Sequence, residues 1–482
     1  MRILLYVLFV AVIVVAWLAY KHLRDTRWEL CDDENVENVV FFIPFWKGEV
    51  SDIQRLYRHY TSMKCVAGGF ILEREEGHRS ELPGCIRQEN DLRKRFVLVD
   101  DAVAGDFVLI ADDDVTIPEH ALCRMVKHAS EHPTELVGLW GRNYPNSQYV
   151  GGDKVGDVDA VLTKGFVAER RMYTRIAEVC RKTAEPYGIP RLNGEDLYFN
   201  FLWETFAGKR RALDVNLRKI RDTGHKHAES ISKRPNHYNT RSNLVHRMRH
   251  TRKGDIYKEL DFRAYSIAVV MWYDDAIKGY ADIAASINRE FCDANGFDFI
   301  VSHERAAPDR APQWERFPLM MQAMQTDMYD YVMWVDADAA FVRENNRDNE
   351  LLKIITLFND KDVLFSGDLD DKKYIQPINS GTIVLKTSTY GKNLLEYWMS
   401  ETCFREGQKK YPQFQDLACI RHTFDNNINH LRKQSHIVPF GTFQTFGHLF
   451  PLHTHPLIRH FTNAPYLNNS DLKEIMLRGM LR

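Results

Sequence analysis

The chain has 482 residues, enough for two large domains or about three of average size. Apolar residues make up 44% and charged residues 27%, so disorder and fibrous architectures are excluded for most of the length. Lys plus Arg (64) nearly balances Asp plus Glu (66), which argues against a nucleic-acid-binding protein. The eight cysteines are too few for a disulfide scaffold and form no Cys-x-x-Cys metal pattern, which leaves one or two structural disulfides open.

An uninterrupted apolar run of 18 residues, 3–20, opens the chain and is followed by basic residues. As a helix it would span about 27 Å, enough for a thin bilayer. The alternative is a cleaved signal peptide, but the apolar core of such a peptide is usually shorter and ends in small residues. We therefore expect residues 1–23 to be an uncleaved transmembrane anchor with its flank, and residues 24–37 to be a stem.

The rest of the chain shows the same strand–helix–strand rhythm twice. The first unit combines an apolar run at Val39–Pro44, an amphipathic stretch with a capping box at Ser51, and a strand-like run at Val66–Leu72. The rhythm restarts at Ser266–Trp272 and continues with a helical stretch whose expected C-cap is Gly296. This alternation is typical of α/β domains with a largely parallel sheet.

A basic segment with little periodicity separates the two halves, and we interpret it as a solvated linker. The domains expected from these patterns are residues 38–250 and 263–482, joined by a linker at 251–262.

Carboxylates follow an apolar strand-like run in each half. Phe107–Ala111 ends in the triplet Asp112–Asp114, and Tyr331–Val335 ends in Asp336-Ala337-Asp338. Such clusters lie at the C-terminal ends of strands, where open α/β sheets bind ligands, and their mutual repulsion is costly unless a cation offsets it. Oxygen donors suit Mg²⁺ or Mn²⁺, which can neutralise a leaving diphosphate. Neither half has a Gly-rich phosphate loop or a Gly-x-Ser-x-Gly elbow, which argues against an ATPase, a dehydrogenase or an α/β-hydrolase.

Six motifs follow one another along the first half: Asn90–Phe96, Asp112–Asp114, Val137–Arg142, Leu162–Thr163, Gly194–Phe201 and Arg234–Arg241. With these motifs, residues 38–250 resemble the C-terminal catalytic domain of exostosins, glycosyltransferase family 64. Members of that family are retaining α-N-acetylhexosaminyltransferases with a GT-A fold, a Rossmann-like fold that binds nucleotide sugars.

The resemblance implies a donor site for a UDP-sugar. Asn90 and Arg95 would hold the UDP moiety, and Asp112 and Asp113 would contact the donor beside Asp114, the chief metal ligand. One departure from the family lies at 73–76, where a Trp-Asn-rich strand end is replaced by charged residues, so contacts to the donor base are expected to differ.

The same resemblance implies two catalytic residues. Asp196 would lie on the acceptor side or the β side of the sugar, and Arg241 would meet the diphosphate and the anomeric region. Alternatives stay open for both: Asp196 also suits a helix N-terminus, Arg241 also suits a linker charge, and Arg234 competes with Arg241 for its role.

The matching stretches of the second half are Asn288–Arg289, Trp314–Leu319, Asp336–Asp338, Asn379–Gly381, Gln415–Asp416 and Arg459–Phe461. Residues 263–475 with these stretches resemble glycosyltransferase family 34, which includes galactomannan galactosyltransferases, xyloglucan xylosyltransferases and yeast α-mannosyltransferase subunits. The resemblance implies that Asp336, Asp338 and His460 bind Mn²⁺, since histidine with carboxylates suits Mn²⁺ better than Mg²⁺.

By the same resemblance Asn379 and Gly381 would line the sugar pocket, and Gln415 with Asp416 would face the donor sugar or the reacting carbon. Arg316 stands where the family has lysine, which keeps the charge but changes its geometry toward a diphosphate.

The leading hypothesis is a bifunctional, metal-dependent glycosyltransferase anchored in the Golgi or ER membrane, single-pass type II, with both GT-A domains in the lumen. Its cofactor would be Mn²⁺, with Mg²⁺ as the alternative. The expected donors are UDP-GlcNAc or a related hexosamine for the first domain, and UDP-xylose, UDP-galactose or GDP-mannose for the second. Both transfers would retain the anomeric configuration and make α-linkages.

Further partners expected are a glycan or glycoprotein acceptor, the lipid bilayer, and a second copy or other glycosyltransferases, with no nucleic acid. Two alternatives stay open: a chain with one catalytic domain and one acceptor-positioning domain, and a glycan-binding scaffold without catalysis.

Overall fold

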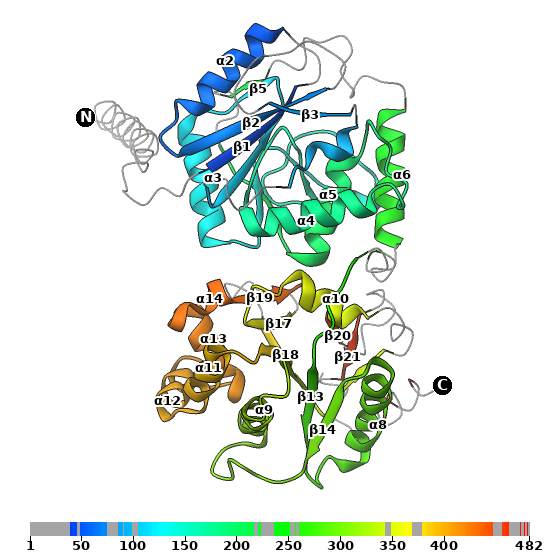
Figure 1. The fold of residues 1–482 in the computed structure, drawn as a ribbon, viewed down its shortest axis with the longest axis vertical. Coiled ribbons are helices and arrows are strands. Elements are labelled where there is room, and N and C mark those ends of the chain that lie inside the picture. The colour runs from blue at the N-terminus through cyan, green and yellow to red at the C-terminus, as the bar shows by residue number, and fades with distance from the viewer. Residues whose placement is uncertain are drawn as a thin grey trace, which may run out of the picture. The chain divides into compact units, whose positions relative to one another are not determined.

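The computed structural model describes residues 39–45, 49–74, 85–89, 91–98, 105–215, 220–222, 236–250, 256, 260–342, 349–368, 378–446, 456–461, 473, 477 and 480. The chain divides into two compact units (Figure 1): unit 1 is Met1–Glu204 with Lys209–Arg249, and unit 2 is Thr205–Gly208 with His250–Arg482. The predicted anchor and stem lie outside the described residues. Within the described part, no helix is long and apolar enough to cross a membrane.

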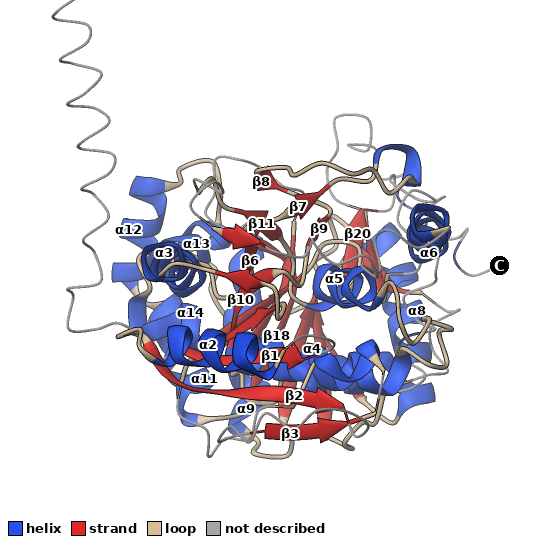
Figure 2. Ribbon diagram, turned by 90° about the horizontal axis from the view of Figure 1, so that it is seen from above, coloured by secondary structure: helices blue, strands red, loops and turns tan. Residues whose placement is uncertain are grey.

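Unit 1 is built on a sheet of eight strands in the order β3-β2-β1-β4-β10-β6-β11-β8, with β3 and β8 at its two edges (Figure 2). The predicted strands are confirmed as β1, β2 and β4, which pair in parallel. β10 pairs antiparallel with β4 and β6, so the sheet is mixed rather than largely parallel. The strands are β1 (Val39–Phe45), β2 (Val66–Arg74), β3 (Cys85–Gln88), β4 (Phe107–Ala111), β6 (Leu136–Gly138), β8 (Gly156–Asp157), β10 (Gly165–Glu169) and β11 (Arg210–Ala212). Two further pairs are β5 (Val115–Thr116) with β12 (Arg221–Asp222), and β7 (Gly141–Arg142) with β9 (Ala160–Val161).

Alternating residues of β1 and β4 build a core on each face of this sheet. One face packs against α2 and α3, because Phe41 and Leu109 share a core with Ile53 and Met125. On the other face Phe166 of β10 stacks on Phe199 of α5, with ring centres 5.6 Å apart. The helices are α2 (Val50–Thr61), α3 (Glu119–Glu131), α4 (Arg170–Thr183), α5 (Glu195–Phe206) and α6 (His237–His250).

The capping box predicted at Ser51 is wrong. α2 begins at Val50, its N-cap is Glu49, and no side chain caps it. Ser51 lies inside the first turn, where its hydroxyl bonds the Glu49 carboxylate at 3.4 Å instead of a backbone N–H. The apolar face at Ile53, Leu56 and Tyr60 is buried as predicted, because packing on the sheet fixes the helix more strongly than its cap does.

Unit 2 has a six-stranded sheet in the order β14-β13-β15-β18-β17-β19. The predicted strands are confirmed as β13, β14 and β15, and Gly296 ends α8 with a φ of 70°, as predicted for a C-cap. The sheet strands are β13 (Ile267–Trp272), β14 (Asp298–Ser302), β15 (Tyr331–Val335), β17 (Val363–Gly367), β18 (Ile378–Lys386) and β19 (Ser435–Val438). A smaller sheet is formed by β16 (Ala339–Phe341), β21 (Ile458–His460) and β20 (Gln444–Phe446).

Helices cover both faces of this sheet (Figure 1). On one face Phe317 of α9, Trp398 of α11 and Phe424 of α13 share a core with the strands, and a disulfide joins Cys403 to Cys419. On the other face lies α8. The helices are α8 (Lys278–Asn295), α9 (Arg316–Gln325), α10 (Glu350–Leu357), α11 (Thr389–Met399), α12 (Glu401–Lys410), α13 (Asp416–Asp425) and α14 (Leu431–Gln434).

The two units share one sheet topology. In unit 1 the strands β2-β1-β4-β10-β6-β11 pair parallel, parallel, antiparallel, antiparallel and parallel. In unit 2 the strands β14-β13-β15-β18-β17-β19 pair with the same succession of directions. β4 and β15 therefore occupy the same place, and each is followed by the acidic cluster found in the sequence. Both units are α/β, as predicted.

Candidate active sites in the two units

The acidic triplet of unit 1 lies directly after β4. Arg95, at the end of the short 3-10 helix η1 (Leu92–Arg95), is buried and donates to Asp112 Oδ1 at 2.5 Å and to Glu195 Oε1 at 3.1 Å. Burial by itself lowers the pKa of Arg95, but the two carboxylates outweigh it and raise that pKa. The structure thus brings Arg95 and Asp112 together. Asp113 and Asp114 are half-buried in the same turn, and Asn90 lies outside the described residues.

The two residues predicted to be catalytic in unit 1 form a buried ion pair. Asp196, in the first turn of α5, accepts a hydrogen bond from Arg241 Nη2 on α6 at 2.6 Å, and both side chains are less than a tenth exposed. Burial raises the pKa of Asp196, but Arg241 outweighs it and holds that pKa below its usual range. The pKa of the neighbouring Glu195 is raised, first by burial and then by Asp196. The pKa of Asp196 is therefore lower than that of its neighbour Glu195.

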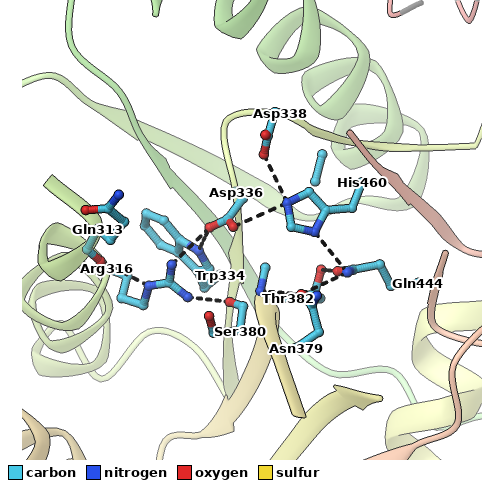
Figure 3. A network of polar contacts seen from close by, with 12 residues as sticks. Gln313, Arg316, Trp334, Asp336, Asp338, Asn379, Ser380, Thr382, Gln444 and His460 are labelled. Carbon is cyan, nitrogen blue, oxygen red and sulfur yellow. Dashed lines mark hydrogen bonds and ion pairs between the residues drawn. The ribbon is translucent and has the colours of Figure 1, made fainter. Parts of the chain in front are cut away.

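A candidate metal centre forms in unit 2 where β15 ends. His460 Nε2 lies 3.0 Å from Asp338 Oδ1 and 3.5 Å from Asp336 Oδ2 (Figure 3). Pairing of β16 with β21 sets Ala339 opposite His460, which brings a late residue of the chain to the end of β15. Within the described residues, this is the one group of three or more His, Cys, Asp or Glu side chains close enough to share an ion. Two oxygens and one imidazole nitrogen fit a transition-metal dication such as Mn²⁺.

A polar network fixes the His460 ring on its other side (Figure 3). Its Nδ1 lies 2.9 Å from Gln444 Nε2, and Gln444 in turn bonds Asn379 at 2.9 Å and Thr382 at 2.7 Å. Gly381 leaves the space for the ring, since a Cβ at this position would lie 2.3 Å from His460 Cε1. Asn379 and Gly381, predicted to line the sugar pocket, therefore lie against the candidate metal ligand, and outer partners of this kind orient metal-binding histidines.

Arg316 joins the metal centre to α13. Its guanidinium donates to Asp336 Oδ1 at 3.2 Å and to the Ser380 carbonyl, and it pairs with Asp416 Oδ2 at 2.9 Å. Asp416 is buried as the first residue of α13, whereas Gln415 is the exposed N-cap residue and its side chain makes no capping hydrogen bond. The structure thus places Asp416 beside Arg316 and Gln415 at the surface.

A second cationic side chain, after Arg316, contacts the candidate metal centre. The ammonium of Lys473 is 2.6 Å from Asp338 Oδ2 and 5.0 Å from the centre of the Tyr280 ring. Burial raises the pKa of Asp338, but His460 and Lys473 outweigh it and lower that pKa to about 2. Asp338 is therefore ionised at any physiological pH.

The pKa of Asp416 is raised, whereas that of Asp338 is lowered, so the two carboxyl groups change the stability of unit 2 with pH in opposite directions. Burial raises the pKa of Asp416 to about 6, since Arg316 is shared with Asp336 and compensates only in part. Because the pKa of Asp416 is higher in the folded than in the unfolded chain, its contribution to the free energy of unfolding is largest below the unfolded pKa of about 4. That contribution is lost as the pH rises to the folded pKa of about 6, which lowers the free energy of unfolding by about 3 kcal/mol. We expect Asp416→Asn to gain stability over the wild type between pH 4 and pH 7. Calorimetry in EDTA checks this, and a difference independent of pH would contradict it.

One comparison with known protein families matches the part of the chain that contains unit 1. The family model described as "Glycosyl transferase family 64 domain" matches residues 9–256, which is more than half of the chain. The chain belongs to glycosyl transferase family 64. The matched residues contain both the Arg95–Asp112 contact and the Asp196–Arg241 pair, and membership makes the protein a transferase acting on nucleotide sugars. No curated protein sequence matches.

Solved glycosyltransferase structures are similar to parts of this family 64 chain at low scores. A glycosyltransferase involved in the glycosylation of the major capsid of PBCV-1 is 12% identical, with a TM-score of 0.36 over 44% of this chain and 99% of its own. The structure of GalNAc-T7 with UDP, GalNAc and Mn²⁺ is 13% identical, with a TM-score of 0.31 over 38% of this chain and 42% of its own. The structure of the galactosyltransferase LgtC with donor and acceptor sugar analogs is 12% identical, with a TM-score of 0.29 over 44% of this chain and 95% of its own. These scores are too low to establish a shared fold.

Several residues at the sites of this family 64 chain escaped the sequence analysis. Lys473 and Gln444 contact the candidate metal centre of unit 2 from segments that have no recognisable sequence pattern. In unit 1 the centre of the Tyr149 ring lies 4.3 Å from Arg241 Cζ, and Tyr149 stands in a loop. Glu195 was predictable, because it stands directly before Asp196 in the motif Gly194–Phe201.

Proposed function

We propose that this family 64 chain is a bifunctional glycosyltransferase with two GT-A domains, one in each unit. The observation that carries the proposal is the repeated sheet topology, with an acidic cluster directly after the equivalent strands β4 and β15. Two acidic clusters at the same place in two matching sheets are best explained by two donor sites of the same kind.

Unit 1 would transfer N-acetylglucosamine or a related hexosamine from UDP with retention of configuration. Arg95 would hold the donor side of the site through Asp112, while Asp196 and Arg241 would flank the reacting carbon. The ionised Asp196 can steady positive charge on the sugar, and Arg241 can offset charge on the leaving diphosphate.

Unit 2 would transfer xylose, galactose or mannose from its nucleotide donor. Asp336, Asp338 and His460 would hold Mn²⁺, with Mg²⁺ as the alternative ion. Bound there, the ion supplies positive charge that neutralises a leaving diphosphate. Gln444 would keep the His460 ring in place, and Arg316 would keep Asp336 turned toward the centre.

We further propose that residues 3–20 anchor the chain in the Golgi or ER membrane as a single-pass type II protein with both units in the lumen. The acceptor would be a glycan or glycoprotein, with a second copy or another glycosyltransferase as assembly partner.

A second candidate function follows from Lys473. Because its ammonium already neutralises Asp338, unit 2 could lack a metal and serve to position the acceptor for unit 1. This candidate predicts one bound ion per chain, whereas the bifunctional proposal predicts two.

The test is donor consumption by the purified full chain in detergent, across a panel of nucleotide sugars with Mn²⁺ and with EDTA. Asp114→Ala and Asp338→Ala run beside the wild type. Bifunctionality predicts two donors, each lost with a different substitution. A single donor lost with Asp114→Ala alone would support the second candidate. Loss of both transfers with one substitution, or no turnover of any donor, would contradict the proposal.

A further inference from the structure

Three buried polar atoms at the Asp196–Arg241 pair of unit 1 have no hydrogen-bond partner, two of them beside the pair and one on Arg241 itself. They are Tyr144 Oη, Arg241 Nε and His237 Nδ1. Tyr144 is 8% exposed, and the charges of Arg241 and Asp196 act on both its hydroxyl and the His237 ring. Proteins rarely leave buried polar atoms unsatisfied, because each costs free energy. Three such atoms at one ion pair point to a ligand rich in hydroxyl groups.

Aromatic rings connect these atoms to the surface of unit 1. The Tyr149 ring lies 5.8 Å from Tyr144, 6.4 Å from His237 and 5.9 Å from Tyr238, centre to centre, and 4.3 Å from Arg241 Cζ. We call these five residues the Tyr149 cluster. Tyr238 is 51% exposed, so the outer wall of the cluster is an open aromatic ring.

The backbone beside the Tyr238 ring is also exposed to solvent. Gly151 has no side chain where a Cβ would lie 3.4 Å from the Tyr238 hydroxyl, and the preceding Val150 is 46% exposed. A half-exposed ring with a hydroxyl at its rim and an apolar neighbour is a suitable surface for the C–H face of a sugar.

The described arginines around the cluster are each balanced by carboxylates. Arg241 pairs with Asp196, Arg95 pairs with Asp112 and Glu195, and Arg142 pairs with Asp153. Burial, and then the charge of Arg241, lower the pKa of His237, which keeps its ring neutral at pH 7. The cluster thus offers no uncompensated positive charge, and burying an anion there would be costly.

We propose that the Tyr149 cluster is the acceptor subsite of unit 1 and that it binds a neutral saccharide rather than a uronic acid. Tyr144 Oη and Arg241 Nε hydrogen-bond hydroxyl groups of the sugar, His237 Nδ1 bonds a further hydroxyl, and the Tyr238 ring packs on the C–H face. The subsite lies beside Asp196, so this assignment rests on the proposed function of unit 1.

The test is saturation-transfer NMR on the full chain in detergent with UDP and Mn²⁺. The probes are the methyl β-glycosides of glucose, galactose and xylose, with methyl β-glucuronide as the charged counterpart. At least one neutral glycoside is expected to bind about tenfold or more tightly than the glucuronide. Tyr144→Phe should weaken that binding about fivefold, since it removes one hydrogen bond, and Tyr238→Ala should weaken it at least as much.

The matched control is Tyr331→Phe, which removes another buried hydroxyl without a partner, in unit 2, and should leave binding unchanged. The assignment is overturned if no neutral glycoside binds the wild type, if the glucuronide binds as tightly, or if Tyr144→Phe and Tyr238→Ala both bind like the wild type. Donor hydrolysis by the same wild-type sample tests the proposed function separately, since it needs no acceptor. Hydrolysis without neutral glycoside binding refutes only the subsite, and glycoside binding without hydrolysis refutes only the transfer activity.

Discussion

Replacing Asp338 with alanine is expected to remove the divalent ion proposed for unit 2 and to abolish the transfer proposed for that unit. The substitution leaves only Asp336 and His460 as ligands, and it takes away the carboxylate nearest to His460 Nε2. We expect Mn²⁺ affinity at this candidate centre to fall about 100-fold or more, since loss of even an outer partner of a metal ligand costs about 10–100-fold. Titration calorimetry with Mn²⁺ measures both the affinity and the number of ions.

The same substitution leaves the buried ammonium of Lys473 without its carboxylate at 2.6 Å. An uncompensated buried charge typically costs about 3–5 kcal/mol, so unit 2 should also unfold more easily. The double variant Asp338→Ala/Lys473→Met separates the two effects, because it should recover stability without recovering metal binding. Asp327→Asn, at an exposed carboxylate paired with Lys392, is the control for charge alone, because asparagine tolerates the φ of 54° at this position. An unchanged number of bound ions in Asp338→Ala would rule out the centre.

The parts of this fold that the sequence predicts well are those that depend on local periodicity. β4 and β15 are continuous apolar runs bounded by acidic residues, and their limits match the predicted ones residue for residue. The left-handed turn at Gly296 is predictable for a similar reason, since glycine tolerates that backbone and ends helices. The prediction of the N-cap of α2 was wrong. Packing of the helix on the sheet decides where it starts, and the Ser-x-x-Gln pattern at Ser51 is too weak to override that packing.

The sites themselves were predictable only in part. The acidic clusters follow from their position after strands, but the contact between His460 and Asp338 depends on the pairing of β16 with β21, which periodicity does not reveal. Only the family resemblance brought His460 into the prediction. Lys473 and the aromatic surroundings of Arg241 depend on side-chain packing between distant segments, and for these the sequence gives no spacing rule.

The two units place different side chains on one sheet topology. After β15 the carboxylates of unit 2 meet an imidazole and an ammonium, whereas after β4 the first carboxylate of unit 1 meets Arg95. The first carboxylate of unit 2 meets an arginine as well, since Asp336 accepts a hydrogen bond from Arg316. What distinguishes the described site of unit 2 is therefore its imidazole and its ammonium, not the absence of an arginine.

Replacing Asp196 with asparagine is expected to have the largest effect in unit 1. The variant keeps the shape of the side chain but leaves the Arg241 guanidinium buried without a negative partner. Loss of one partner of such a pair typically costs about 3–5 kcal/mol. If Asp196 has the catalytic role proposed above, loss of its charge should slow transfer by about 100-fold or more. Thermal unfolding and donor consumption measure the two effects.

The pH dependence of that loss identifies its cause. Because Arg241 holds the pKa of Asp196 below its usual range, the pair stabilises unit 1 above the unfolded pKa of about 3.9, and this stability disappears as the pH falls through the lower folded value. The stability difference between wild type and Asp196→Asn should thus be full at pH 7 and shrink toward pH 3. Glu195→Gln is the matched control, since its pKa is raised and its removal should shift stability in the opposite sense. A difference for Asp196→Asn that stays constant down to pH 3 would show that the carboxylate acts through its shape and not through its charge.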